Sequence, residues 1–284
     1  MRKTGIVAVF VLLFAILSAC AHSTGTVANE SASPVLDRIL DKGELVVGTA
    51  GSMPPLNMTT KDGEIIGLEP DIAQLIASAM GVKLRFEIMP FSELLQSLEE
   101  GKIDMILSGM TITSKRNLKV AFVGPYFKSG KAFLTKMKTI AESDDTKEIN
   151  RPDLKLVALK GSTSQLFIQT VFFNATLVTA RDYDEAVDML IRDEVHAMVA
   201  DYPICVISVV RYPEEGLMSI ITPLTYEPLG IAVPLNDPHL VNWTENFLKS
   251  LEGSGALKEL KKRWFENPSW LNKLPERKTG EHTL

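Results

Sequence analysis

The sequence is poor in the residues on which several protein classes depend. It has two cysteines and four scattered histidines in 284 residues, too few for a disulfide framework and without the spacing of a zinc site. It has no basic excess either, since 30 Lys and Arg residues face 35 Asp and Glu residues and the formal net charge is -5. Nucleic acid is therefore not expected as a partner. We expect no metal and no cofactor.

The composition is that of an ordinary globular protein. Hydrophobic residues make up 45% and charged residues 23%, a balance that excludes a disordered chain. At roughly 150 residues per domain, this length predicts two lobes or one large domain.

The first twenty residues have the layout of an export signal: two basic residues, an apolar run at 6–17, and small residues after it. The run is too short to span about 30 Å of hydrocarbon. Residues 17–20, Leu-Ser-Ala-Cys, resemble the lipobox of bacterial lipoproteins. This resemblance implies that residues 1–19 are a signal peptide and that Cys20 carries a lipid. The alternative is an ordinary signal peptide cut at the same bond.

The segment after the signal has a different character. Residues 20–33 are small, polar and aperiodic, which predicts a flexible tether, and the fold is expected to begin near Pro34. The signal predicts export to the periplasmic or cell-surface side of a membrane, where a lipid on Cys20 would hold the protein. Cys205 would then have no cysteine partner.

Strand and helix patterns occur twice in the same order. Strands are expected at 44–49, 82–88 and 103–107 with helices at 71–80 and 92–100, then strands at 155–159, 175–180 and 195–200 with helices at 163–172 and 184–192. At an offset of 92 residues, part of the two sets also matches in residue type, which places Gly109 opposite Asp201. Alternating strands and helices predict parallel sheets, and ligands bind beyond the carboxyl ends of such strands. The alternative is that generic helix–strand units look alike.

Seven ordered segments resemble the extracellular solute-binding proteins of family three, the amino-acid receptors of bacterial ABC importers. They are residues 67–73 (GLEPDIA), 101–113 (GKIDMILSGMTIT), Arg116, 124–127 (GPYF), 161–163 (GST), 227–233 (EPLGIAV), and 255–257 with 262–265. The resemblance covers residues 44–265. It implies an α/β, two-lobed periplasmic-binding-protein fold, each lobe a mainly parallel sheet flanked by helices, joined by two hinge strands near 130–136 and 222–227.

The same resemblance implies how the chain is divided and what it does. Lobe 1 would comprise residues 34–131 and 225–272, lobe 2 residues 132–224, and a C-terminal tail residues 273–284. An amino acid would bind in the cleft, and closure about the hinge would bury it. The partner would be an ABC transporter permease in the membrane. We expect a monomer with no catalytic residues.

The family pattern assigns the two ends of an amino acid to two charged residues. Arg116 would clamp the carboxylate, because a guanidinium can grip a carboxylate bidentately. Asp201 follows an apolar strand and would accept from the ammonium. Without the resemblance, Arg116 would be interpreted as a solvated surface charge and Asp201 as a turn or cap residue.

The remaining candidate ligand contacts surround these two charges. By resemblance, Thr111, Ser162 and Thr163 supply donors, and Gly109 brings its carbonyl to the ammonium because a glycine permits close approach. Phe91 precedes Ser92, the expected cap of the helix at 92–100, and would form an aromatic wall. Further contacts are Met53, where relatives commonly carry a second aromatic, and Met110, which is either core or pocket lining.

Two other functions stay open. Cyclohexadienyl dehydratases share this fold, but acid–base catalysis needs a spare titratable group in the pocket, and the sequence offers none beyond Arg116 and Asp201. A ligand sensor for a membrane receptor is the other. We also expect uncharged amino acids to bind more tightly than arginine or lysine, since no acid is placed at the side-chain end of the pocket unless Glu69 or one near Glu185 reaches it.

Overall fold

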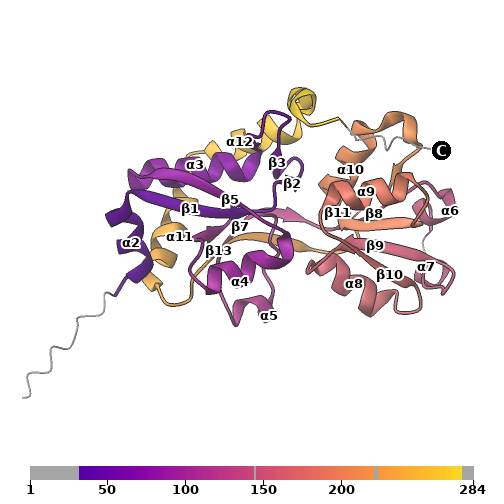
Figure 1. The fold of residues 1–284 in the computed structure, drawn as a ribbon, viewed down its shortest axis with the longest axis horizontal. Helices are drawn as coiled ribbons and strands as arrows, with labels where there is room; N and C mark the ends of the chain where they lie inside the picture. The colour runs from indigo at the N-terminus through magenta and orange to yellow at the C-terminus, as the bar shows by residue number, and fades with distance from the viewer. Residues whose placement is uncertain (1–31, 144, 221–222, 277–284) are drawn as a thin grey trace, which may run out of the picture. The chain divides into compact units, whose positions relative to one another are not determined.

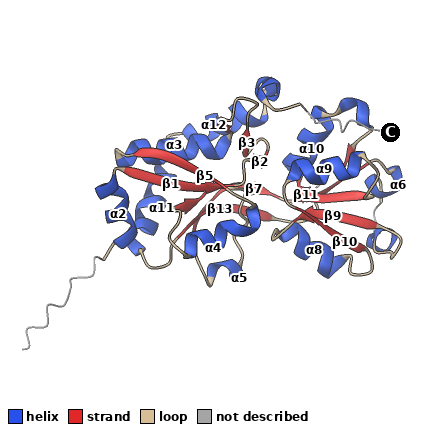
Figure 2. Ribbon diagram, in the orientation of Figure 1, coloured by secondary structure: helices blue, strands red, loops and turns tan. Residues whose placement is uncertain are grey.

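The structure, a computed structural model, describes residues 32–143, 145–220 and 223–276. The signal segment, Cys20 and most of the tether lie outside these ranges, so their predictions are untested. The chain from Ser33 onward is one unit, and within it two five-stranded sheets are each flanked by helices (Figures 1 and 2). The expected α/β two-lobed fold is confirmed.

The first sheet has the strand order β5-β1-β6-β13-β7. The strands β1 (Glu44–Thr49), β5 (Lys83–Ile88) and β6 (Met105–Ile106) are parallel. Strand β13 (Glu227–Val233) pairs antiparallel with β6, and β7 (Ala121–Ser129) pairs antiparallel with β13. The helices of this lobe are α2 (Pro34–Lys42), α3 (Leu68–Met80), α4 (Leu94–Glu99), α5 (Ser114–Asn117), α11 (Pro238–Gly253) and α12 (Ala256–Phe265). Helices α3 and α4 lie on opposite sides of the sheet (Figure 1). A small sheet of β2 (Ser52–Met53), β3 (Asn57–Thr59) and β4 (Ile65–Ile66) extends this lobe toward the other.

The second sheet has the order β10-β9-β11-β8-β12. The strands β9 (Lys155–Leu159), β10 (Thr176–Ala180) and β11 (Ala197–Asp201) are parallel. Strand β8 (Lys131–Thr135) pairs antiparallel with β11, and β12 (Met218–Ser219) pairs antiparallel with β8. The helices are α6 (Lys138–Ala141), α7 (Thr146–Ile149), α8 (Thr163–Val171), α9 (Tyr183–Ile191) and α10 (Tyr202–Arg211).

The duplicated order that the sequence predicts is present in both lobes. The series β1-α3-β5-α4-β6 corresponds to β9-α8-β10-α9-β11, and in each the first strand lies between the second and the third. Each sheet is mixed because one strand, β13 in the first sheet and β8 in the second, runs opposite to the other four. Corresponding strand ends therefore occupy corresponding places in the two lobes.

Local sequence signals explain where most of these helices begin and end. The side chain of Asp182 accepts from the Glu185 backbone N–H at the start of α9, and Gly81 ends α3 in the left-handed conformation. The expected cap at Ser92 is wrong. A 3-10 turn, Phe91–Glu93, precedes α4, which begins at Leu94 without a side-chain cap.

The chain crosses between the lobes at two places that lie against each other. The outward crossing runs from β7 through Gly130 into β8, and the return crossing leads into β13. The Lys131 N–H donates to Thr225 Oγ1 at 3.0 Å, and the Leu224 N–H donates to the Lys131 carbonyl at 2.8 Å. These bonds fix the backbone of Lys131 at the hinge.

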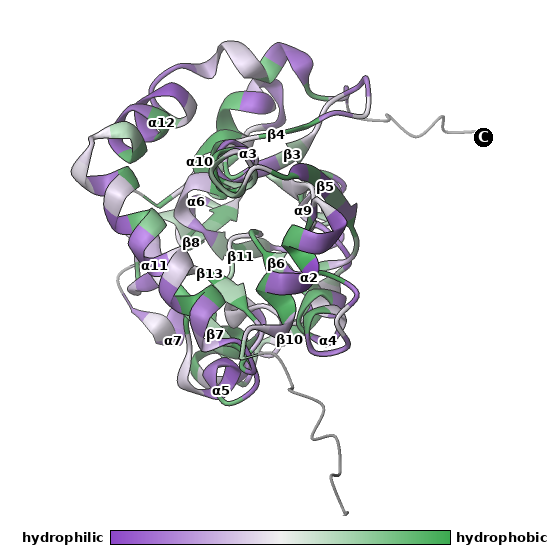
Figure 3. Ribbon diagram, turned by 90° about the vertical axis from the view of Figure 1, so that its left-hand side faces the viewer, coloured by the Kyte–Doolittle hydropathy of each residue, from purple (hydrophilic) through white to green (hydrophobic). Residues whose placement is uncertain are grey.

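The core of the unit follows the two sheets. The strands that are central to them are almost fully buried, and Figure 3 shows hydrophobic strands inside a shell of more hydrophilic helices. A 3-10 helix, Pro268–Lys273, follows α12 and buries Trp270. Within the described ranges, none of the helices combines the length and apolarity that crossing a bilayer requires.

Candidate functional site

A small cavity lies between the lobes where β6 and β11 end. Its volume is about 10 Å³, room for at most one water molecule, so the cleft is closed. The lining residues are Met53, Phe91, Gly109, Thr111, Arg116, Lys131, Leu159, Ser162, Thr163, Tyr183 and Asp201. All candidate ligand contacts lie here except Met110, which is fully buried in the core and is not among the lining residues. The roles of these residues as ligand contacts stay predictions.

Arg116 links the two lobes. It lies on the short helix α5, whose N-cap Thr113 accepts from the Arg116 backbone N–H. One guanidinium nitrogen donates to the Thr111 carbonyl at 2.9 Å and another to the Gly161 carbonyl of the second lobe at 3.1 Å. The residue is 8% exposed, and burial lowers the pKa of the guanidinium to about 10. Arg116 is thus a buried cation whose donors are held by carbonyls in the closed cleft.

Two apolar side chains of the first lobe, Phe91 and Met53, also line the cavity. The Arg116 guanidinium carbon lies 5.5 Å from the centre of the Phe91 ring, within the range of a cation–π contact. Met53 is 1% exposed and packs against Gly109, which has a φ of 59°. A Cβ at Gly109 would lie 2.5 Å from the Met53 methyl carbon, and the residue carrying it would have to adopt a left-handed backbone conformation, so glycine is the favoured residue there.

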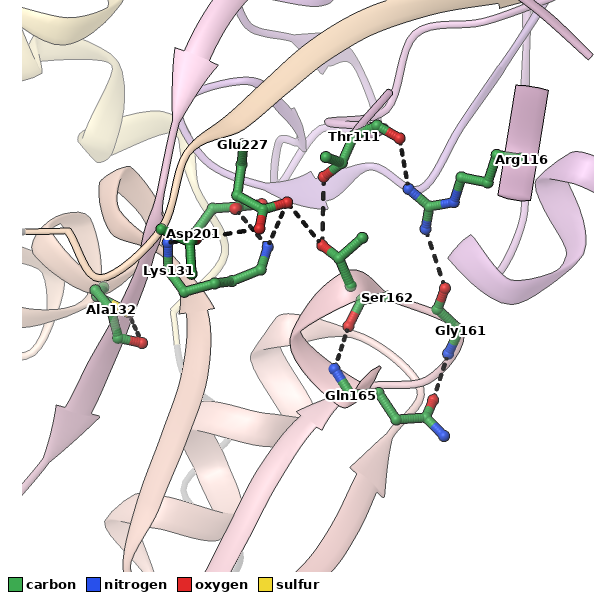
Figure 4. A network of polar contacts seen from close by, with 12 residues as sticks. Thr111, Arg116, Lys131, Ala132, Gly161, Ser162, Gln165, Asp201 and Glu227 are labelled. Carbon is green, nitrogen blue, oxygen red and sulfur yellow. Dashed lines mark hydrogen bonds and ion pairs between the residues drawn. The ribbon is translucent and has the colours of Figure 1, made fainter. Parts of the chain in front are cut away.

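The serine and threonine hydroxyl groups of the site already have partners. Ser162 caps α8 by accepting from the Gln165 backbone N–H. Thr163 donates to Glu227 Oε2 at 3.0 Å, and its oxygen lies 3.3 Å from Thr111 Oγ1 in the other lobe. The threonine pair is a second polar contact across the cleft (Figure 4).

A charged cluster at the hinge completes the site. Lys131 Nζ lies 2.9 Å from Asp201 Oδ1 and 3.4 Å from Glu227 Oε2, and its side chain is 2% exposed (Figure 4). Thr225 also donates to Glu227, at 3.1 Å. A series of contacts therefore runs from Asp201 through Lys131 and Glu227 to the threonine pair.

A third buried carboxylate near the site, Glu69, supports it without lining the cavity. It accepts from the Gly109 N–H at 2.6 Å, from the Asn57 amide at 2.5 Å and from the Tyr126 hydroxyl. Burial raises the pKa of Glu69, while the three hydrogen bonds oppose that shift. Glu69 thus fixes the backbone at Gly109, which lines the cavity.

The sequence did not point to Lys131, Leu159, Tyr183 or Glu227 as site residues. Tyr183 begins α9 and is 3% exposed, and burial raises the pKa of its hydroxyl. The sequence does contain a signal by which Lys131 and Glu227 could have been found. Lys131 opens the apolar strand KAFLT, and Glu227 opens the strand EPLGIAV, each at an expected hinge.

A larger hollow, of about 570 Å³, lies elsewhere between the lobes. It is lined by residues such as Ser52, Asp182 and Arg211, and neither Arg116 nor Asp201 belongs to it. Arg211 there donates to Asp184 and to the Pro275 carbonyl. Volume alone therefore does not identify the site, because the two candidate residues Arg116 and Asp201 and the ends of β6 and β11 meet at the smaller cavity.

The chain matches the family model of bacterial extracellular solute-binding proteins, family 3, over residues 45–267. It belongs to this family. The match includes both lobes and every residue that lines the cavity. The family resemblance derived from the seven sequence segments is therefore confirmed.

Individual relatives include binding proteins and an enzyme. The glutamine-binding protein of an ABC transporter from Bacillus subtilis is 30% identical over 268 residues, which is 90% of this chain and 96% of that protein. Cyclohexadienyl dehydratase from Pseudomonas aeruginosa is 23% identical over 248 residues, 87% of this chain and 92% of that enzyme. A candidate ABC-transporter binding component from Wolinella succinogenes, solved with lysine, is 35% identical with a TM-score of 0.76, and the match covers 82% and 100% of the two chains.

Proposed function

We propose that this protein captures an α-amino acid between its lobes, closes about the hinge, and delivers the ligand to the permease of an ABC importer. Arg116 is proposed to bind the ligand carboxylate and Asp201 the ligand ammonium. The protein would work as a monomer, without a cofactor, on the outer side of the membrane that holds it.

One observation carries this proposal. A buried guanidinium from one lobe and a buried carboxylate from the other line the same cavity. An amino-acid zwitterion carries the complementary charges on one carbon, and a guanidinium binds a carboxylate through two charge-assisted hydrogen bonds. The carbonyls that now hold Arg116 would be exchanged for the ligand carboxylate when the cleft opens and closes again.

The test is a thermal-shift screen of the purified, ligand-stripped protein against the twenty amino acids. A ligand at 100 times its Kd should stabilise the folded protein by about 2.7 kcal/mol. At least one amino acid should raise the melting temperature in a dose-dependent way. If none does at millimolar concentration, the proposal fails.

A dehydratase-like activity is the second candidate, and the structure gives it one supporting observation. Lys131 and Glu227 are ionisable groups at the cleft that the sequence did not place there, so the lack of a spare titratable group no longer argues against catalysis. The Lys131 ammonium is, however, held by Asp201 and Glu227, and Glu227 also accepts from Thr163 and Thr225. We therefore retain binding without catalysis as the proposal. Loss of prephenate or arogenate at a rate proportional to protein concentration would replace it with the enzyme.

Membrane attachment is a separate part of the proposal. The motif at residues 17–20 supports a lipid on Cys20. We expect Cys20→Ala to release the exported protein from the membrane fraction without changing amino-acid binding. Membrane fractionation with a lipid-labelling assay measures this, and unaltered retention of the variant would refute the anchor. If the closed protein binds a membrane receptor and not a permease, the sensor function would take the place of import.

A further inference from the structure

Lys131 is a buried cation to which amino-acid capture assigns no task. The lysine and Asp201 are register partners on the antiparallel strands β8 and β11, so their side chains are neighbours on one face of the second sheet. Both residues belong to the same sheet. Opening of the cleft would therefore leave this ion pair intact, and an arriving ligand meets an Asp201 that already has a cation beside it.

The charges around the cavity are balanced before a ligand enters. Arg116 and Lys131 are the cations, and Asp201 and Glu227 are the carboxylates. Glu69 accepts hydrogen bonds from three uncharged donors, one of them the Gly109 N–H, and does not line the cavity. A zwitterion with an uncharged side chain adds one charge of each sign and keeps the balance. A basic side chain would add a buried cation without a carboxylate, which is strongly disfavoured.

The side chain of Lys131 also takes up space. It lines the cavity, and about 10 Å³ remains empty beside it. Its flexible four-carbon stem ends in a compact ammonium, as the side chain of a lysine ligand does. The protein thus holds at Asp201 and Glu227 an ammonium of the kind that a basic ligand would bring.

We propose that Lys131 is the residue that sets ligand specificity. As a tethered ammonium, it neutralises Asp201 and Glu227 and reserves the site for amino acids with uncharged side chains. This inference rests on the proposed function of amino-acid capture. Asp201 can still accept from the ligand ammonium, because an ionised carboxylate has about four acceptor positions and the contact with Lys131 uses one.

The experiment compares the Kd of lysine with that of the tightest-binding uncharged amino acid by competition titration on ligand-stripped protein. In the wild type, lysine should bind at least tenfold more weakly. Lys131→Met should shift this ratio toward lysine by at least tenfold, because two carboxylates then face one protein cation. The double variant Lys131→Met/Glu227→Gln should return toward the wild-type ratio, since it restores the balance. The control Lys128→Met removes an exposed lysine three residues earlier and should change nothing.

A second variant keeps the test decisive if Lys131→Met does not fold. Glu227→Gln conserves shape and leaves an extra cation in the site, so it should shift preference toward glutamate by at least tenfold relative to the wild type. Two outcomes overturn the inference while leaving amino-acid capture in place: a wild type that prefers lysine or arginine, or variants that keep the wild-type ratio. A wild type that binds no amino acid at all refutes the proposed function itself.

Discussion

The two lobes each bury a carboxylate near the end of their third parallel strand, and they stabilise it in different ways. In the first lobe, Glu69 accepts from an amide, a backbone N–H and a phenol, all neutral donors. In the second lobe, Asp201 is the last residue of β11 and faces the ammonium of Lys131. Glu69 does not line the cavity but holds the backbone of Gly109, which does. Asp201 lines the cavity directly.

The difference separates a structural carboxylate from one that is available to a ligand. Three donors fixed by the fold satisfy Glu69, so any change of partner leaves buried groups unsatisfied. Asp201 has one lysine as its ion-pair partner and lines the cavity, so it can share its remaining acceptor positions with an incoming ammonium. The duplicated strands thus end at equivalent positions in the two lobes. The hydrogen-bond and ion-pair partners of each carboxylate determine whether it is structural or available to a ligand.

The largest expected effect tests the structural carboxylate. Glu69→Gln should lower the free energy of unfolding by about 3 kcal/mol, because one of the three donors loses its acceptor and the new amide N–H₂ faces donors, at roughly 1 to 3 kcal/mol for each unsatisfied group. Chemical denaturation measures this. The control Glu64→Gln changes an exposed acid in the same lobe and should have almost no effect. If the two variants have the same free energy of unfolding, Glu69 does not stabilise the backbone at Gly109.

The next effect concerns the cation that faces Asp201 from the other lobe. Arg116→Ala should weaken amino-acid binding by at least ~2 kcal/mol, roughly thirtyfold, since a bidentate clamp loses two charge-assisted hydrogen bonds. Calorimetry measures the loss. Lys115→Ala removes an exposed positive charge from the same helix and serves as the control. A loss below threefold in folded Arg116→Ala would return Arg116 to the role of a structural bridge between the lobes.

Much of the fold could be predicted because its strands are short apolar runs with clear ends. Strands β1 and β9 begin and end where the sequence predicts, and the duplicated order correctly placed Gly109 and Asp201 at equivalent strand ends. The start of α4 was wrong because Ser92 falls inside a 3-10 turn, where its side chain does not cap a helix.

The charged cluster could not be predicted in the same way. Lys131 and Asp201 are 70 residues apart, and they meet only because β8 and β11 pair antiparallel in one particular register. A sequence pattern gives the type of a strand but not its register with a distant partner. Glu227 likewise reaches the site through the second hinge crossing. Residue type and spacing therefore identified Arg116 and Asp201 through the family motif, while the residues that balance their charge required the structure.

The smallest expected effect tests whether closure of the cleft contributes to binding. Gly161 has a φ of 79°, and a Cβ there would lie 3.2 Å from both Cα and Cβ of Ser92 in the opposite lobe. Gly161→Ala should lose about 1 kcal/mol of stability through backbone strain. Because the new methyl group also obstructs closure, affinity should fall about fivefold, or about 1 kcal/mol. Gly216 lies in the second lobe with a φ of 66° and has nothing within 4 Å of its Cβ position, so Gly216→Ala should lose similar stability and keep its affinity. Denaturation and calorimetry on both variants separate the two effects, and equal affinities would mean that the lobes need not approach this closely to hold a ligand.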